Sequence, residues 1–539
     1  MSTDDKYTDV ADGGLLKSTS VVGSMTILSR ISGLARDIGF AHWFGASIVM
    51  DAFFVAFKIP NLLRRFFAEG AFSQAFVPVI AEYRANCSGP ETRELLDRVT
   101  GTLGAVVFLI TAAGVAAAPI LIMIFAPGFL GDDGRYDMAT DMLRFTFPYL
   151  FFISLTALAG GILNTFRRFA VPAFTPVLLN LVLISFAAWV APGMERPAMG
   201  LALGVFVAGA VQLLFQLPFL LQLGMLPLPK WGWAHEGVKR ILKLMLPVIF
   251  GSSVAQINLL FDTLIASFLA AGSISWLYYS DRLMEFPLGV FGIAVATVML
   301  PHLSEHHAKA SPERFSASLD WALRLVLLIA APAALGLVVL ARPLLTTLFY
   351  GGAFTANDVT MATASLLAYA VGLLGFILVK VLSTGFFSRQ DTRSPVRIGV
   401  MAVVLNMALN VVFVVAMVRS EFYAPHVGLA LATTLSSLFN AVMLFRGLRR
   451  EGVYRPGLGW SRFGSQVIVA TVVMSAAVVW VRDRAGDWLA MSLAERVWTL
   501  AVCVLGGIFV YFAACLVVGL RPASLRSQTS AQAGSGGPP

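Results

Sequence analysis

Charged residues are scarce in this sequence. Asp, Glu, Lys and Arg make up 13% of the 539 residues, whereas apolar residues make up 58%. A soluble globular protein averages about 25% charged residues. The composition therefore excludes a large soluble domain. It predicts an all-α polytopic membrane protein, because many apolar segments reach the roughly 20 residues that a membrane-spanning helix needs.

Cysteine is also rare, and the spacing of Cys87, Cys503 and Cys515 fits neither a metal site nor a disulfide framework. No Walker motif is present, which excludes ATP hydrolysis by this chain. The basic connections between the apolar segments contain no acidic cluster of the kind that a metal-dependent membrane glycosyltransferase needs. No cofactor and no metal site are predicted.

The apolar segments predict about 14 transmembrane helices. They lie near 17–43, 51–84, 99–127, 141–166, 173–192, 199–223, 241–270, 276–308, 316–349, 359–387, 395–418, 427–446, 464–482 and 493–519. Lys and Arg gather in every second connection, for example at Arg84, Arg93 and Arg98. The positive-inside rule places these connections and both termini in the cytoplasm, which also accounts for the net charge of +9.

An internal repeat divides the chain. Three pairs of segments match in the same order: 44–60 with 271–287, 77–85 with 300–308, and 163–177 with 382–396. Because the copies begin six spans apart, they share one orientation and predict two six-helix lobes related by a parallel pseudo-repeat, plus two C-terminal helices. The predicted parts are a disordered cytoplasmic N-terminus (1–16), an N-terminal lobe (17–224), a C-terminal lobe (237–450), two extra helices (463–520) and a disordered cytoplasmic tail (523–539).

Charge inside the predicted spans is the main functional signal. Each such residue costs about 2.5–3.5 kcal/mol at the centre of a span, so it normally faces a partner or water. The charged residues are Arg30, Arg36 and Asp37; Asp51, Lys58, Arg64, Arg65 and Glu69; and Asp281, Arg282 and Glu285. Spacings of seven and four place residues 51, 58, 65 and 69 near one stripe of a helix.

Cations exceed acids in the first lobe, and spare guanidinium groups favour an anion such as phosphate. Plainer interpretations exist for individual residues. Arg30 and Arg36 can reach a membrane face along their apolar stems. Arg64 or Arg65 can form a structural ion pair with Glu69, and Asp281 can neutralise Arg282.

A second group of polar residues is a candidate site for a coupling ion. Asp262 is a lone acid in an apolar span, and Asn406 and Asn410 lie four residues apart on one helix face. With Thr433 or Thr434 they form a candidate site for Na⁺ or H⁺. The plain alternative is interhelical hydrogen bonding, which asparagine commonly provides in membranes. Membrane potential acting on the charged residues is a further energy source.

Four motifs carry a family resemblance: "SRISGLARD", "DAFFVAFKIPNLLRRFFAEGAFSQAFVPVIAEY", "YYSDRLMEFPLGVFG" and "GFFSRQDTRSPV". Together they resemble the MurJ (MviN) lipid II flippases of the multidrug/oligosaccharidyl-lipid/polysaccharide exporter superfamily, over about residues 18–520. The resemblance implies fourteen helices, a lipid-tail groove at the last two helices, and export of lipid-linked peptidoglycan precursor across the bacterial inner membrane. The substrate residues that it implies are Arg30, Arg36, Asp51, Arg64, Arg65, Glu69 and Arg282, with Lys58, Asn61, Asp281 and Glu285 as secondary cavity candidates.

These residues lead to a hypothesis of alternating access. Arg30, Arg36 and Arg282 bind the diphosphate of lipid II in a central cavity, and the two lobes then open outward. The expected partners are lipid II, membrane lipids and cell-wall synthesis or division proteins, and no nucleic acid. The alternatives are a flippase for another polyprenyl-diphosphate glycan and a drug/cation antiporter, although an antiporter for cations needs an acidic rather than a basic cavity.

Overall fold

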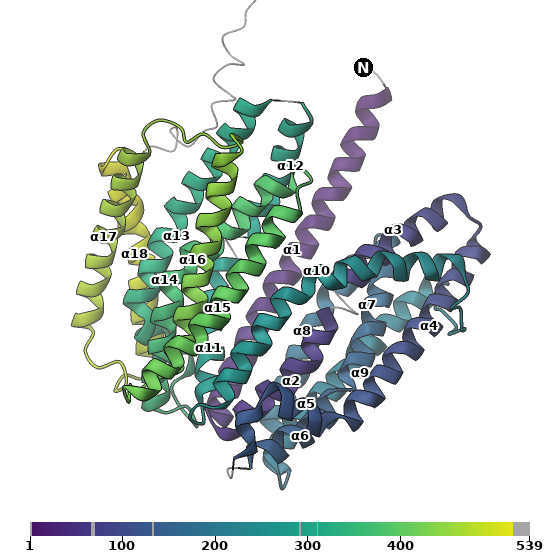
Figure 1. Ribbon diagram of the computed structural model, residues 1–539, viewed down its shortest axis with the longest axis horizontal. Coiled ribbons are helices and arrows are strands. Elements are labelled where there is room, and N and C mark those ends of the chain that lie inside the picture. Colours follow the sequence, from purple (N-terminus) through teal and green to yellow (C-terminus); the bar gives the residue numbers. More distant parts are fainter. Residues whose placement is uncertain (1–2, 66–69, 132–133, 290–292, 310, 521–539) are drawn as a thin grey trace, which may run out of the picture. The chain divides into compact units, whose positions relative to one another are not determined.

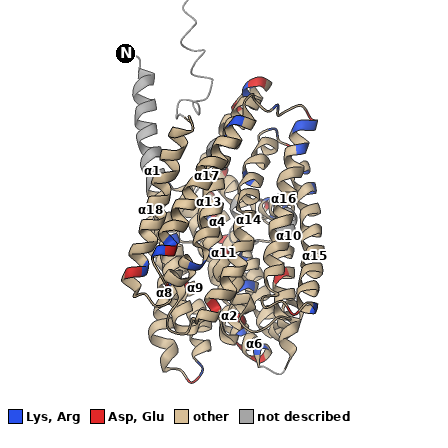
Figure 2. Ribbon diagram, turned by 90° about the vertical axis from the view of Figure 1, so that its left-hand side faces the viewer, with Lys and Arg blue, Asp and Glu red and all other residues tan. Residues whose placement is uncertain are grey.

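The computed structural model describes residues 3–65, 70–131, 134–289, 293–309 and 311–520. Throughout this part of the chain the regular elements are helices (Figure 1). Ten of them are long and apolar enough to cross a membrane. Most of the helical ribbon carries no charged residue (Figure 2). The prediction of an all-α polytopic membrane protein is confirmed.

The first compact unit comprises residues 1–272. Its described α-helices are α1 (Thr3–Phe44), α2 (Ile48–Arg64), α3 (Gly70–Asn86), α4 (Gly89–Ala116), α5 (Ala118–Phe125), α6 (Arg135–Thr146), α7 (Tyr149–Thr165), α8 (Ala170–Ser185), α9 (Pro197–Gln222) and α10 (Glu236–Ser267). Short helical turns follow α5 (Pro127–Leu130) and α8 (Phe186–Val190 and Ala191–Gly193). Within this unit α8 packs along α1, α9 packs against α7 and α8, and α10 packs against α3.

The second compact unit comprises residues 273–539. Its described helices are α11 (Ser273–Pro287), α12 (Ile293–Ala308), α13 (Pro312–Phe349), α14 (Ala356–Phe387), α15 (Arg393–Arg419), α16 (Val427–Arg450), α17 (Trp460–Arg484) and α18 (Leu493–Val517). Helix α14 contacts α11, α12, α13 and α16. The division into units falls after α10, one helix later than the predicted lobe boundary, and the lobe assignment itself stays a prediction.

Proline divides two of the predicted spans into shorter helices. The span predicted at 99–127 is α4 followed by α5, with Pro119 in the first turn of α5. The span predicted at 141–166 is α6 followed by α7, with Pro148 directly before α7. Proline has no backbone N–H to continue the hydrogen-bond ladder of the preceding helix, and its ring collides with that helix's last turn. Each proline therefore favours a short break before the following helix, although Arg135–Thr165 still forms one candidate membrane span.

Capping residues fix the starts of two helices in the second unit. Thr355 caps α14 and Ser492 caps α18, each in a reciprocal pair with an acid three residues later, Asp358 and Glu495. Each pair satisfies backbone N–H groups that the first turn of a helix leaves without partners. The pairs set where α14 and α18 begin.

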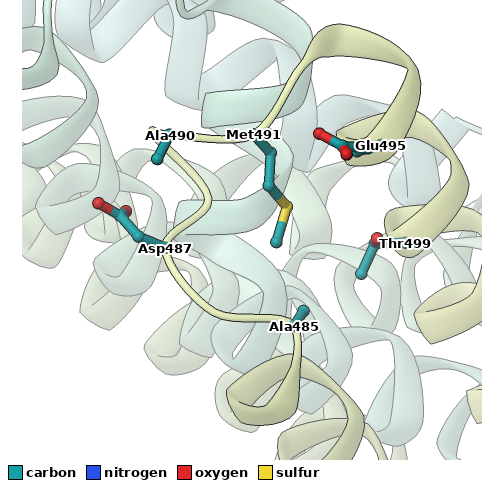
Figure 3. Close-up of a pocket in the computed structure, with 6 residues that line it drawn as sticks. All are labelled: Ala485, Asp487, Ala490, Met491, Glu495 and Thr499. Carbon is teal, nitrogen blue, oxygen red and sulfur yellow. The ribbon is translucent and has the colours of Figure 1, made fainter.

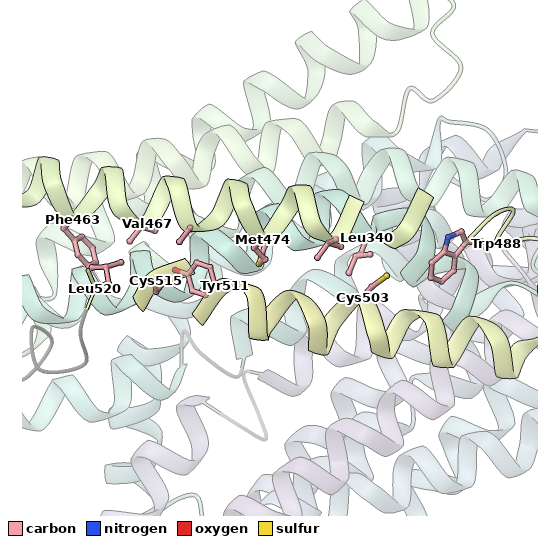
Figure 4. Packing of buried hydrophobic residues seen from close by; sticks show 11 residues of the cluster. Leu340, Phe463, Val467, Met474, Trp488, Cys503, Tyr511, Cys515 and Leu520 are labelled. Carbon is pink, nitrogen blue, oxygen red and sulfur yellow. The ribbon is translucent and has the colours of Figure 1, made fainter. Parts of the chain in front are cut away.

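The last two helices share an apolar core with α13. Met474 of α17 and Cys503 and Tyr511 of α18 are buried in one cluster that also includes Leu340 of α13 (Figure 4). Tyr511 donates a hydrogen bond of 2.6 Å to the carbonyl oxygen of Leu328, also on α13. The α17–α18 pair is thus bound to α13 by packing and by a partly buried hydrogen bond. A lipid-tail groove along these helices stays a prediction.

Asp320 of α13 holds the connection between α16 and α17. Its Oδ1 accepts hydrogen bonds from the Tyr454 hydroxyl (2.7 Å) and the Gly457 amide (3.0 Å). The same oxygen accepts from Trp460 Nε1 at 2.6 Å, and Oδ2 accepts from Arg324 Nε at 2.8 Å. A single carboxylate therefore ties this connection, and with it the start of α17, to α13.

Candidate functional site

Arg36 of α1 is buried inside the first unit, with 4% of its surface exposed. Its Nε and Nη2 donate to Asp37 Oδ1 at 3.0 and 2.6 Å. Its Nη1 donates to Asn180 Oδ1 on α8 at 3.1 Å. The guanidinium also lies over the Phe40 ring, 5.6 Å from its centroid. Arg36 is therefore held by an ion pair, an amide and an aromatic face, and it does not lie at a membrane face.

Asn180 binds α1 with its other amide atom as well. Its Nδ2 donates to the Ser29 carbonyl oxygen (3.2 Å) and to Ser32 Oγ (3.0 Å). Ser29, Ser32 and Arg36 lie three and four residues apart, so they share one face of α1. Arg30 lies on the exposed side of the same helix, and within the described residues it has no ion pair. The two arginines that the sequence grouped together thus lie in different surroundings.

Polar residues on α2 pair with α10 and with the turn that follows it. Asp51 is completely buried, and its Oδ2 accepts a hydrogen bond of 2.7 Å from the Gly272 amide. Gly272 has a φ of +95°, which favours glycine because a side chain is strained there. Asp51 lies in the first turn of α2, where a negative charge is stabilised by the helix dipole.

The next two members of the stripe reach α10 itself. Lys58 Nζ donates to Thr263 Oγ1 at 2.6 Å, and Arg65 Nη1 donates to Gln256 Oε1 at 3.1 Å. Residues 58 and 65 are seven apart, and so are their partners. We call the three pairs Asp51–Gly272, Lys58–Thr263 and Arg65–Gln256 the α2–α10 ladder. Its order is antiparallel, and its partners on α10 are neutral side chains.

The remaining candidates near α2 differ in how far the structure describes them. Arg64 and Asn61 are half-buried. Glu69 lies outside the described residues. The predicted stripe is therefore observed as a ladder at residues 51, 58 and 65, while its fourth member stays a prediction.

Charge on α11 gathers on the side that does not face α14. Trp276 Nε1 donates to Asp358 Oδ1 at 2.8 Å, and the Ser280 hydroxyl donates to the Ala362 carbonyl oxygen at 2.7 Å. These bonds fix one face of α11 against α14. On another face, Arg282 Nη1 donates to Glu285 Oε2 at 3.1 Å.

The surroundings of Arg282 differ from those of Arg36. Both members of the Arg282–Glu285 ion pair are partly exposed, and the guanidinium lies 5.4 Å from the Tyr278 ring centroid. Asp281 is half-buried. Arg282 lies in the second unit and Arg36 in the first, so their grouping around one cavity stays a prediction.

The predicted ion-site residues of the second unit come together between α15 and α16. Asn410 Nδ2 donates to Asn406 Oδ1 at 2.9 Å, and Asn406 Nδ2 donates to Thr433 Oγ1 at 3.3 Å. Thr434 instead donates to the Ala368 carbonyl oxygen on α14. Among the described residues there is no group of three His, Cys, Asp or Glu side chains arranged for a metal ion.

Asp262, the fourth member of the predicted ion site, belongs to the first unit and is half-buried. The pairing of Asn406 with Thr433 is what interhelical hydrogen bonding predicts, and it also places several side-chain oxygens together. Binding of Na⁺ or H⁺ at this place stays a prediction.

A shallow pocket of about 360 Å³ lies at the connection between α17 and α18 (Figure 3). It is lined by Ala485, Asp487, Ala490, Met491, Glu495 and Thr499. Asp487 Oδ1 accepts from the Leu489 amide, and Glu495 Oε2 accepts from the Ser492 amide and hydroxyl. Its acids serve the local turn and the start of α18, and none of the predicted substrate residues lines it.

The sequence of this chain matches a protein-family model over most of its length. Residues 40–499 match the model described as lipid II flippase MurJ. A probable lipid II flippase MurJ from Vibrio cholerae is 48% identical over 522 residues, which cover 96% of this chain and 98% of that protein. The chain belongs to the MurJ family. The lipid II flippase MurJ of Burkholderia cenocepacia is 42% identical over 95% of this chain and 99% of its own length.

Solved structures agree with membership of the MurJ family. A lipid II flippase MurJ in an inward closed conformation has a TM-score of 0.76 at 26% identity, covering 92% of this chain and 98% of that one. An inward-facing multidrug transporter of the MATE family has a TM-score of 0.65 at 14% identity, covering 80% and 98%. The MATE likeness shows a shared fold alone. The chain is thus a membrane transporter of the MurJ family rather than an enzyme.

Sequence reasoning missed the partners that hold the cations in this MurJ-family chain. Asn180, Gln256 and Thr263 are neutral residues in apolar spans, and none was a candidate. The available signal was spacing, because Gln256 and Thr263 are seven apart, as are Lys58 and Arg65. Without knowledge that α2 and α10 are neighbours, this match could not be recognised.

Proposed function

We propose that this chain translocates lipid II from the cytoplasmic to the outer leaflet of the bacterial inner membrane. The observation that carries the proposal is family membership, because the match to the MurJ family extends over nearly the whole chain. Lipid II joins a polyprenyl chain to a disaccharide-pentapeptide through a diphosphate. Moving this polar head group through hydrocarbon needs a hydrated route lined by hydrogen-bonding groups.

Arginine is the residue suited to receive the diphosphate, because its planar fork donates two parallel hydrogen bonds. Arg30, Arg36 and Arg282 are the proposed ligands, with Arg64 and Arg65 supporting them. Each of the paired arginines then exchanges its present partner for a phosphate oxygen. In this proposal Glu285 releases Arg282, and Asp37 with Asn180 releases Arg36.

Asp51 and Glu69 are the acids that hold or release cations between the inward-open and outward-open states. The two predicted lobes rock against each other in this mechanism, with both termini in the cytoplasm. The coupling ion is Na⁺ or H⁺ at Asp262, Asn406, Asn410 and Thr433, or membrane potential acts directly on the charged residues. Cell-wall synthesis and division proteins are further proposed partners.

The test is replacement of the resident flippase in a bacterium. Its own lipid II flippase is depleted, and the chain or a variant is supplied from a plasmid. Outer-leaflet lipid II is then measured as the fraction that an added, membrane-impermeant lipid II hydrolase cleaves. Arg30→Ala and Arg282→Ala should each lower this fraction by at least about tenfold, because a charge-assisted hydrogen bond is worth about 1.5–3 kcal/mol.

Arg393→Ala is the matched control, because Arg393 is an exposed arginine at the start of α15 that lies outside the proposed site. It should keep export unchanged, and all variants must reach the membrane in equal amounts. Normal export by both Arg30→Ala and Arg282→Ala rejects the proposed diphosphate ligands. Absence of export by the unmodified chain rejects the proposed function.

A further inference from the structure

Asn180 is the side chain from α8 that contacts the buried arginine of α1. It is itself buried, with 5% of its surface exposed. Both atoms of its amide are used, because Oδ1 accepts from Arg36 and Nδ2 donates to Ser29 and Ser32. The two serines position the amide, and the amide in turn binds the arginine. Asn180 thereby fixes the position of Nη1 of the Arg36 guanidinium.

The present position of Arg36 is closed to an external anion. Arg36 has 4% of its surface exposed, Asp37 accepts from Nε and Nη2, and Asn180 accepts from Nη1. A diphosphate cannot reach these nitrogens unless Arg36 moves and its hydrogen bonds are exchanged. Every hydrogen bond that holds Arg36 here therefore competes with the anion.

We propose that Asn180 is a positioning residue that latches Arg36 in an anion-free position and so sets the affinity for lipid II. This inference rests on the proposed function, in which Arg36 binds the diphosphate. The neutral amide makes a latch of intermediate strength. Alanine makes the latch weaker, and aspartate makes it stronger because a carboxylate binds guanidinium more tightly than an amide does.

A purely structural role gives a different expectation. Asparagine in a membrane helix commonly forms interhelical hydrogen bonds that only stabilise the fold. In that case both substitutions lower thermal stability, and the folded protein keeps the same affinity for lipid II. Affinity and stability must therefore be measured separately on the same samples.

The experiment uses the full chain in lipid nanodiscs and purified lipid II as the probe. Binding is followed by tryptophan fluorescence, and the thermal midpoint is recorded for each variant. Asn180→Ala should lower the Kd about tenfold, and Asn180→Asp should raise it about tenfold, as expected for one hydrogen bond to a charged group. The opposite signs are the signature of a latch.

Two further variants serve as a second test and as a control. Ser32→Ala removes an acceptor of the Asn180 amide and should tighten binding by a smaller factor, which keeps the test available if Asn180→Ala does not fold. Thr175→Val is the matched control, because Thr175 is a buried residue of α8 that accepts from Gln216 rather than contacting Arg36. It should leave the Kd unchanged.

Arg36→Ala distinguishes failure of the Asn180 latch from failure of the diphosphate role of Arg36. In one outcome Arg36→Ala weakens lipid II binding, but Asn180→Ala and Asn180→Asp both leave the Kd unchanged or shift it in the same direction. The latch is then wrong, and the proposed function stands. If Arg36→Ala binds lipid II like the unmodified chain, the diphosphate role of Arg36 fails and the latch with it. In the double variant Arg36→Ala/Asn180→Ala, the tightening should disappear.

Discussion

Single side chains in the first unit show how cations are accommodated among apolar helices. Arg36, Lys58 and Arg65 each donate to a neutral oxygen, from an asparagine, a threonine and a glutamine. An amide or hydroxyl oxygen satisfies a donor without cancelling the charge of the cation. Arg36 also forms an ion pair with the neighbouring Asp37, and in the second unit Arg282 pairs with Glu285.

His426 is the side chain whose protonation should control stability. It precedes the span that begins at Val427, it is completely buried, and its Nε2 donates to the Met361 carbonyl oxygen at 3.1 Å. Its ring lies 5.0 Å from the ring of Trp276, which donates to Asp358. Burial lowers the pKa of His426 from 6.5 to about 4.

The sign of the effect follows from proton uptake. Below pH 6.5 the unfolded chain binds a proton at His426, whereas the folded chain binds it only as the pH approaches 4. The free energy of unfolding therefore decreases as the pH falls from 6.5 to about 4. Going from about pH 7.5 to about pH 5 should lower the free energy of unfolding by about 2 kcal/mol. Denaturant unfolding in detergent micelles measures this change.

His426→Asn should remove most of this pH dependence, because asparagine does not titrate. His302→Asn is the control, since His302 is exposed and its loss should leave the pH dependence in place. An equal response to pH in the His426→Asn variant and the unmodified chain would falsify the assignment.

For single residues, the sequence was sufficient to predict which charged side chains are candidates for the site, but not which side chains they contact. Arg36 and Asp37 are neighbours in the chain, so their ion pair could have been expected. Asn180 lies 144 positions away from Arg36. Its role depends on α8 packing along α1, which is a tertiary contact that a single sequence does not contain.

Among the helices, the connection from α16 to α17 depends most on one residue. Asp320 accepts hydrogen bonds from Tyr454, Gly457, Trp460 and Arg324. Asp320→Asn replaces one acceptor oxygen with a donor that faces Arg324 or the connection. We expect a loss of about 3 kcal/mol, because donors in partly buried positions are left without an acceptor.

Thermal unfolding in micelles measures this loss as a lower midpoint. Asp391→Asn is the comparison, because Asp391 has a local role in accepting from the Ser394 amide at 3.0 Å, and it should cost about 1 kcal/mol. Equal midpoints for the two variants would show that Asp320 does not hold the connection.

Helix positions were well predicted where the apolar runs were uninterrupted. The span predicted at 199–223 is α9, and the span predicted at 395–418 is α15. The predicted spans that contain Pro119 and Pro148 each have a short break next to the proline, although Arg135–Thr165 still forms one candidate membrane span. The α2–α10 ladder was beyond reach, because it depends on which helices are neighbours.

For the whole molecule, orientation in the membrane is the prediction that a single thiol can test. Cys87 is a free, exposed cysteine between α3 and α4, close to Arg84 in the last turn of α3. The positive-inside rule places this connection in the cytoplasm. A membrane-impermeant maleimide should therefore label the protein in inside-out vesicles but not in intact spheroplasts.

Cys87→Ser should abolish the labelling, because Cys503 and Cys515 are buried. Labelling of Cys87 from outside intact cells would reverse the predicted orientation of the whole chain. The same reversal would move both termini to the outer side of the membrane.

Membership of the MurJ family was recognisable from the sequence, because long motifs rich in charge are rare within apolar spans. The internal repeat also indicated two related halves, although where one half ends was less clear. Boundaries between packed units depend on which helices contact each other. Helix α10 packs with α3 in the first unit, and its sequence alone does not reveal this preference.

The α2–α10 ladder has a consequence for how its cations become available. Lys58 and Arg65 are joined to the same neighbouring helix, and so is Asp51 through the turn behind it. If that helix is drawn away, the amine, the guanidinium and the carboxylate lose these three hydrogen bonds together. The three charged groups would then become available for new contacts at the same time instead of one by one.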